Sequence, residues 1–245
     1  MSHTLHRFGP EESFENDFCV VSRPAMGFNE RGAAPKLRKI IEILYEAGVA
    51  NSGSLTSREN IFTEGFDKQK MLDRIEDNSP LNAVFSSREN LVKALERLKE
   101  EDLGISVVVT GLRDKVEDIC EEVGLTPHSL DISLGIFGKT ELLSDEETMC
   151  VSSMCGHAMI SAGLVAQIRK SVEDGVLSPE EGAKRLAKPC YCGVFNIQRT
   201  EDFLSAWSGR KEEASKQQSG KVAKLQSSKK NRRLYDDEAE MRKCR

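Results

Sequence analysis

The sequence is poor in aromatic residues and has no long apolar run. Aromatic residues make up 6% of its 245 residues, and no apolar stretch approaches the roughly 20 residues that a membrane-spanning helix needs. The first residues also lack the apolar stretch of a secretory signal. We therefore expect a protein with no membrane partner that is located in the cytoplasm, where cysteines are usually reduced.

Complete phosphate-binding motifs are also missing. The sequence has no Gly-x-Gly-x-x-Gly, and the Gly138-Lys139-Thr140 run has Ser133 where a phosphate loop needs its first glycine. We interpret this region as a glycine turn after a strand, in which Lys139 could line a pocket. Nucleotide binding through either motif is therefore excluded.

Outside the C-terminal tail, negatively charged residues outnumber positively charged ones. Residues 210–245 contain twelve Lys and Arg against six Asp and Glu, while the whole chain has a net charge of −5. The preceding residues therefore carry a net charge of −11 and would repel nucleic acid. We predict a disordered basic tail over 209–245, and we interpret its Lys229–Arg233 run as a solvated segment.

The pattern of apolar residues predicts an α+β fold in a single domain, 1–208. Over 17–137, strands are expected near 18–21, 83–85, 105–110 and 129–137, with helices between them and a turn at 51–54. Over 144–208 the pattern is helical, with N-caps at Ser144 and Ser178 and a long helix over 157–174. We therefore expect a layered sheet-and-helix N-terminal half and a helical, cysteine-bearing C-terminal half.

Four of the seven cysteines fall between residues 150 and 192: Cys150, Cys155, Cys190 and Cys192. Two antiparallel helices joined by a short turn would place Cys155 beside the Cys190–Cys192 loop. We expect Cys155 to lie at the N-terminus of the 157–174 helix, where free backbone amides favour a thiolate. Soft ligands on both sides of a helical hairpin are typical of a metal or iron–sulfur site.

Four interpretations of these cysteines compete. They could be ordinary buried core residues. They could form a zinc site of Cys₃His type with His157, although structural zinc usually uses cysteine pairs separated by two to four residues. Cys155, Cys190 and Cys192 could hold an iron–sulfur cluster and leave one iron open. Finally, Cys155 or Cys192 could act as a metal-free nucleophile with His157 as base. A nucleotide deaminase is excluded, because no glutamate follows His157 and the cysteine spacing is one residue short.

We favour an iron–sulfur-dependent enzyme with lyase-like chemistry on a small polar substrate. Cys155, Cys190 and Cys192 would hold the cluster, and His157 would donate or accept a proton. Cys150 is not expected to be a ligand, because it lies in the packed end of the helical turn that begins at Ser144. The alternative is a non-enzymatic interaction or regulatory protein that binds zinc.

Three other candidate residues lie in predicted loops. Arg23 and Asn29 could bind an anionic substrate, and His128 could act as a ligand. For all three we favour the simpler interpretation of a solvated loop residue.

Overall fold

The computed structural model describes residues 4–209. The chain divides into two compact units, Met1–Leu204 and Ser205–Arg245. The predicted disordered tail lies outside the described residues, apart from its first position. None of the helices within residues 4–209 combines the length and apolar character needed to cross a membrane. The regular elements are η2 (Glu11–Phe14), β1 (Phe18–Ser22), α1 (Ala34–Ala47), β2 (Asn51–Ser54), β3 (Glu59–Asn60), α2 (Lys68–Asp73), β4 (Leu81–Phe85), α3 (Arg88–Glu101), β5 (Val107–Thr110), α4 (Arg113–Val123), η3 (Thr140–Leu142), α5 (Glu146–Ser152), α6 (Ala162–Glu173) and α7 (Pro179–Ala187).

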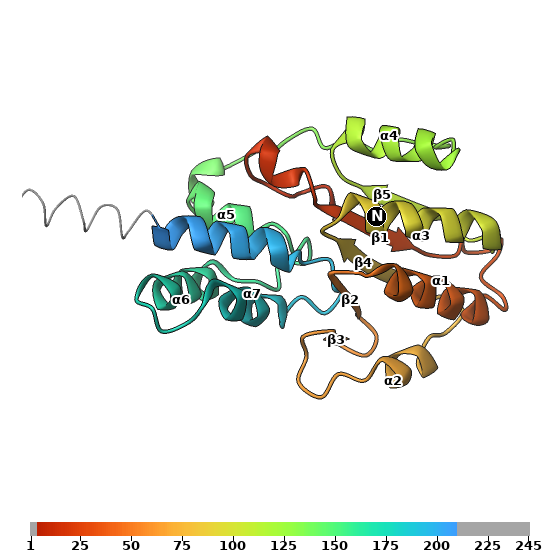
Figure 1. The fold of residues 1–245 in the computed structure, drawn as a ribbon, viewed down its shortest axis with the longest axis horizontal. Helices are drawn as coiled ribbons and strands as arrows, with labels where there is room; N and C mark the ends of the chain where they lie inside the picture. Colours follow the sequence, from red (N-terminus) through yellow and green to blue (C-terminus); the bar gives the residue numbers. More distant parts are fainter. Residues whose placement is uncertain (1–3, 210–245) are drawn as a thin grey trace, which may run out of the picture. The chain divides into compact units, whose positions relative to one another are not determined.

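The predicted α+β fold is confirmed. The N-terminal part is a five-stranded antiparallel sheet with the order β3-β2-β4-β1-β5. Helices α1 and α3 pack side by side over this sheet, and α4 packs against α3 (Figure 1). The C-terminal part is helical and contains α5, α6, α7 and a helix that begins at residue 197. It also carries the cysteines of the candidate site.

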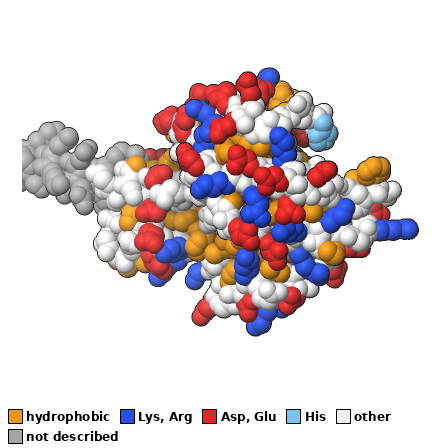
Figure 2. Space-filling view, turned by 45° about the vertical axis from the view of Figure 1, so that its right-hand side comes forward, with side chains coloured by type: hydrophobic (Ala, Val, Ile, Leu, Met, Phe, Trp, Pro, Cys, Tyr) orange, Lys and Arg blue, Asp and Glu red, His pale blue; other side chains and the backbone are white. Residues whose placement is uncertain are grey.

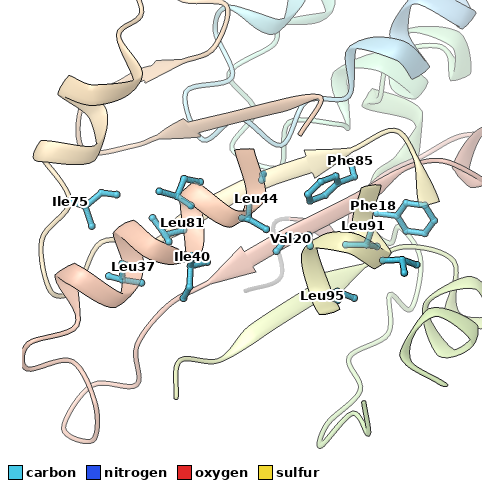
Figure 3. Packing of buried hydrophobic residues seen from close by; sticks show 14 of the residues in the cluster. Phe18, Val20, Leu37, Ile40, Leu44, Ile75, Leu81, Phe85, Leu91 and Leu95 are labelled. Atoms are coloured by element: carbon cyan, nitrogen blue, oxygen red, sulfur yellow. The ribbon is translucent and has the colours of Figure 1, made fainter. Parts of the chain in front are cut away.

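The main core lies between the sheet and its helices. Phe18 and Val20 of β1 contribute to this core, together with Phe85 of β4 (Figure 3). Helices α1 and α3 cover them with apolar faces that include Leu37 and Leu91, which are fully buried. Because side chains alternate along a strand, Cys19 points to the opposite face of the sheet. On that face, the Cys19 side chain lies next to the C-terminal residues of the site.

Helix boundaries follow local sequence signals at several places. Gly48 and Gly124 end α1 and α4 in the left-handed conformation that glycine adopts at low cost. Ser178 caps α7, whose first residue is Pro179, as predicted. The cap of α5 is one residue later than predicted, because the Asp145 side chain accepts the Thr148 amide.

Three sequence-based expectations are wrong. Residues 51–54 form the buried strand β2 and not a turn, because they lie between β3 and β4. Residues 129–137 are irregular despite their alternating pattern, because no strand pairs with them within residues 4–209. The long helix over 157–174 begins only at Ala162, after the Ser161 cap. Ala158, with φ of 53°, interrupts any right-handed helix before that point.

Charged side chains of both signs are interspersed on the surface. Figure 2 shows Lys and Arg beside Asp and Glu over one face, with hydrophobic side chains between them. Most of the ion pairs are exposed, as in Arg113–Glu117 and Lys184–Glu180. Such pairs contribute little to stability, about 1 kcal/mol or less each. The exception is a buried charge cluster beside the cysteines.

Candidate metal centre

The three predicted cysteine ligands lie together in two turns that follow helices. Cys155 follows α5, and Cys190 and Cys192 follow α7. The Sγ atoms of Cys190 and Cys192 are 3.7 Å apart, and the Cys155 thiol is hydrogen-bonded to Cys190. Their exposures are 3%, 0% and 1%. The structure therefore brings three sulfurs together away from solvent. We call this group the thiol cluster (Cys155, Cys190, Cys192).

Backbone amides point at the thiol cluster. The amides of His157 and Met159 contact the sulfur of Cys155, and the amide of Phe195 contacts the sulfur of Cys190. Donors of this kind favour the thiolate form and tune metal–thiolate centres. They come from loops, so the expected position of Cys155 at a helix N-terminus is wrong. The same electrostatic effect is supplied by a turn and not by a helix dipole.

Without a metal, Cys155 and Cys190 hold their protons. The hydrogen bond to Cys190 raises the pKa of Cys155 far above its ordinary value, and burial adds to the increase. The hydrogen bond from Cys155 lowers the pKa of Cys190, but the Cys192 contact and burial raise it to about 12. The thiols of Cys155 and Cys190 are therefore neutral at physiological pH. Metal binding at the cluster would release protons, because the ligand is the thiolate.

The side chains of the other two sequence candidates of this region are not part of the thiol cluster. His157 is exposed, whereas the thiol cluster is buried. Cys150 is on α5, as predicted, and is 6% exposed. A Cβ added at Gly9 would meet Cys150 Sγ at 3.5 Å and Arg199 Nη2 at 2.6 Å. Cys150 therefore packs beside the N-terminal segment and Arg199, and its predicted non-ligand role remains a prediction.

A buried charge cluster, which the sequence analysis missed, adjoins the cysteines. Asp17 accepts Arg7 Nη1 at 2.7 and 2.8 Å and Arg199 Nη1 at 3.0 Å. The three side chains are 0%, 5% and 3% exposed, respectively. Asn196 donates a further hydrogen bond to Asp17 at 2.9 Å. Two buried guanidinium groups therefore share one buried carboxylate, so this cluster has an excess of one positive charge.

The pKa shifts of the two arginines reflect this imbalance. Burial lowers the pKa of Arg199, the attraction of Asp17 opposes the decrease, and repulsion from Arg7 adds to it. For Arg7, burial is the largest single effect and lowers the pKa, but Asp17, Cys19 and Cys190 together outweigh it and the net shift is upward. Negative charge beside Arg199 would therefore be favourable, because it would offset the uncompensated positive charge.

Arg7 connects this charge to the thiols through one peptide bond. Its Nη2 donates to the Cys19 Sγ at 2.7 Å and also to the Val194 carbonyl. The N–H of the same peptide bond, on Phe195, contacts Cys190. Since a cation on the carbonyl polarises the peptide, it strengthens the N–H as a donor to sulfur. Cys19 and Cys190 lie on opposite sides of this peptide, so Cys19 belongs to the surroundings of the thiol cluster.

Strands β2 and β3 hold the Cys190–Cys192 turn in place. The Asn60 amide donates to the carbonyls of Ala187, Lys188 and Cys190 at 2.9, 3.2 and 2.9 Å. Gly193, with φ of 75°, lies against β2 so closely that an added Cβ would be 2.2 Å from Gly53 N. The turn is therefore fixed by backbone contact as well as by hydrogen bonds.

The remaining sequence candidates lie outside this site. Asn29 connects two loops, because it accepts from the Ala25 amide of its own loop and donates to the Gly104 carbonyl in the connection between α3 and β5. Arg23, His128 and Lys139 are exposed. The Lys229–Arg233 run falls outside the described residues.

The six described cysteines are all free and buried. Within residues 4–209, no group of three or more His, Cys, Asp or Glu side chains has the arrangement of a preformed metal site. Cys155 and Cys192 both contact Cys190, which is therefore the central thiol of the three. Comparison with protein families, curated proteins and solved structures finds no match to this chain.

Proposed function

We propose that this protein binds an iron–sulfur cluster through Cys155, Cys190 and Cys192. The observation that carries the proposal is the excess buried positive charge beside a cluster of buried thiols. In the metal-free protein this arrangement is unfavourable, because the single carboxylate of Asp17 balances only one of the two buried guanidinium groups, Arg7 and Arg199. A metal–thiolate centre is negatively charged when three or four thiolates bind it, so it would offset that charge.

The amide contacts to sulfur support the same proposal. Hydrogen bonds to cysteine sulfur are among the features that set the stability and potential of iron–sulfur centres. Cys155 and Cys190 both have such contacts, and Arg7 strengthens one of them through the Val194–Phe195 peptide. A group of buried core thiols would need neither the donors nor the adjacent cations.

Three cysteine ligands would leave one iron of a four-iron cluster without a protein thiolate. Such an iron would supply Lewis-acid activation of a hydroxyl or sulfur group of a small polar substrate, which is lyase-type chemistry. His157 lies two residues after Cys155, and its side chain is exposed. An imidazole can donate or accept a proton near neutral pH. We propose His157 as the proton donor or acceptor, in a cytoplasmic protein whose thiols stay reduced.

A single zinc ion is the second candidate, and one distance favours it. Two thiolates on a tetrahedral zinc ion with bonds of 2.3 Å are about 3.8 Å apart. The Cys190 and Cys192 sulfurs are already 3.7 Å apart, whereas ligands of two different irons would have to separate. His157 would then be the fourth ligand of a closed, non-enzymatic site.

Anaerobic purification, absorption spectroscopy and metal analysis distinguish these candidates. An iron–sulfur cluster requires iron and acid-labile sulfide with visible absorption, whereas a zinc site requires one colourless zinc ion per chain. Serine at Cys155, Cys190 or Cys192 should abolish binding. Cys120→Ser is the matched control, since Cys120 is a free, buried thiol on α4. Equal metal content in all four variants would refute the proposed ligands.

A further inference from the structure

One segment of the chain exposes an unusual number of large apolar side chains. Over residues 130–143 seven of them are between 45% and 78% exposed: Leu130, Ile132, Leu134, Ile136, Phe137, Leu142 and Leu143. They account for more than half of the exposed large hydrophobic residues in the described part of the chain. Monomeric proteins rarely expose contiguous apolar surface of this kind without using it for binding.

An open strand edge lies close to this segment. Strand β5 ends the sheet and pairs with β1 alone, and its four residues are only partly buried. A cavity of about 710 Å³ runs along β5 and is also lined by α3, α4 and residues 125–133. Unpaired amide and carbonyl groups along such an edge are a template for another strand.

We propose that residues 129–137 of one protomer pair with β5 of a second copy of this chain, and that the exchange is reciprocal. The segment alternates apolar and small or polar residues from Leu130 to Ile136, as a half-buried strand does. Added to β5, it would place these apolar residues over the cavity and satisfy the edge hydrogen bonds.

A second copy fits this surface better than an unrelated partner. Each chain carries both complementary parts, the open edge and the unpaired segment, which a two-fold symmetric dimer requires. The five exposed apolar side chains within the pairing segment offer roughly 600 Å² on each protomer before the β5 edge is counted, and about 800 Å² per partner is typical of a stable interface. Within one chain these side chains stay 45–78% exposed even though residues 129–133 already border the cavity along β5, so a second copy can supply their cover.

The test is the mass of the full chain in solution, measured by light scattering over a wide range of concentrations. The wild type should be a dimer. Leu134→Lys should raise the dimer dissociation constant at least about thirtyfold, because it places a charge in the proposed interface. Val176→Lys is the control, since Val176 is 74% exposed and Leu134 is 77% exposed. It should leave the dimer unchanged.

A second variant tests strand pairing itself. Ile132→Pro removes an amide that a ladder needs, and Ile132 lies in irregular structure where the monomer tolerates proline. It should also weaken the dimer, with unchanged monomer stability. A wild type that stays monomeric would overturn the proposal and indicate closure on its own β5 or a different partner. Dimers that resist both variants would also overturn it, since the interface would then lie elsewhere.

Discussion

Replacement of Gly193 by alanine should destabilise the protein far more than the same change at a glycine of equal backbone conformation. Gly193 has φ of 75° and Gly32 has φ of 73°. Alanine in this left-handed region costs about 1–2 kcal/mol at either site. At Gly32 an added Cβ would meet nothing within 4 Å, so the backbone term is the whole expected effect.

At Gly193 the Cβ would meet backbone that cannot move easily. It would lie 2.2 Å from Gly53 N and from Ser52 C, and both atoms belong to β2. Since β2 is hydrogen-bonded to β3 and β4, relief requires a shift of the sheet or of the Cys190–Cys192 turn. Overpacking of this kind typically costs 1–3 kcal/mol, and a rigid neighbour favours about 3. The total for Gly193→Ala is therefore about 4–5 kcal/mol.

Urea denaturation followed by circular dichroism measures both variants against the wild type. We expect Gly193→Ala to lose at least about 2 kcal/mol more than Gly32→Ala. The freed turn should also expose its thiols, so Cys190 and Cys192 should react faster with a thiol reagent. Equal losses in the two variants would refute the reasoning, because the contact between the turn and β2 would then be too loose to matter.

Two further predictions concern buried charge and buried thiols. Asp17→Asn leaves Arg7 and Arg199 without their carboxylate and should lower the free energy of unfolding by about 3–5 kcal/mol. Glu117→Gln breaks an exposed ion pair and should lower it by about 1 kcal/mol or less. Similar losses in the two variants would contradict the buried-charge argument. Burial raises the pKa of Cys19 from 9.0 to about 12. The metal-free protein should therefore be fully stabilised by this group below pH 9 and lose that stability as the pH rises towards 12. Urea midpoints measured across this range should fall more steeply for the wild type than for Cys19→Ala, and parallel curves would refute the assignment.

The sequence predicts those elements whose signals are local. The helices that end at Gly48 and Gly124, and the Ser178-Pro179 start of α7, are recognisable because each signal lies within one turn of the boundary. Strand β2 was missed because Asn51–Ser54 contains no large apolar residue; its burial comes from neighbours on both sides and from Gly193. The opposite error occurred at 129–137, where a good strand pattern has no partner within the chain.

The candidate site divides in the same way. Cys155, Cys190 and Cys192 were identifiable because they cluster along the chain. Arg7, Asp17 and Cys19 were missed, since no spacing in the sequence connects them with Val194 or with residues beyond it. The proline, glycine and cysteine residues around the Cys190–Cys192 turn indicated a site in the sequence, but nothing in the sequence indicated the nearby cations, Arg7 and Arg199. Only tertiary structure brings those charges to the sulfurs.

This arrangement has a consequence for how the protein is made. Arg7 contacts Val194 across 187 residues, and Asp17 contacts Arg199 across 182. During synthesis Arg7 and Asp17 therefore cannot make these two contacts until nearly the whole described chain has emerged, although β1 can already pair with β4 and β5. Contacts of such long range form slowly, because the intervening chain must first be ordered. A metal centre at the thiol cluster, next to these contacts, would therefore be assembled as a last step, after the sheet has folded.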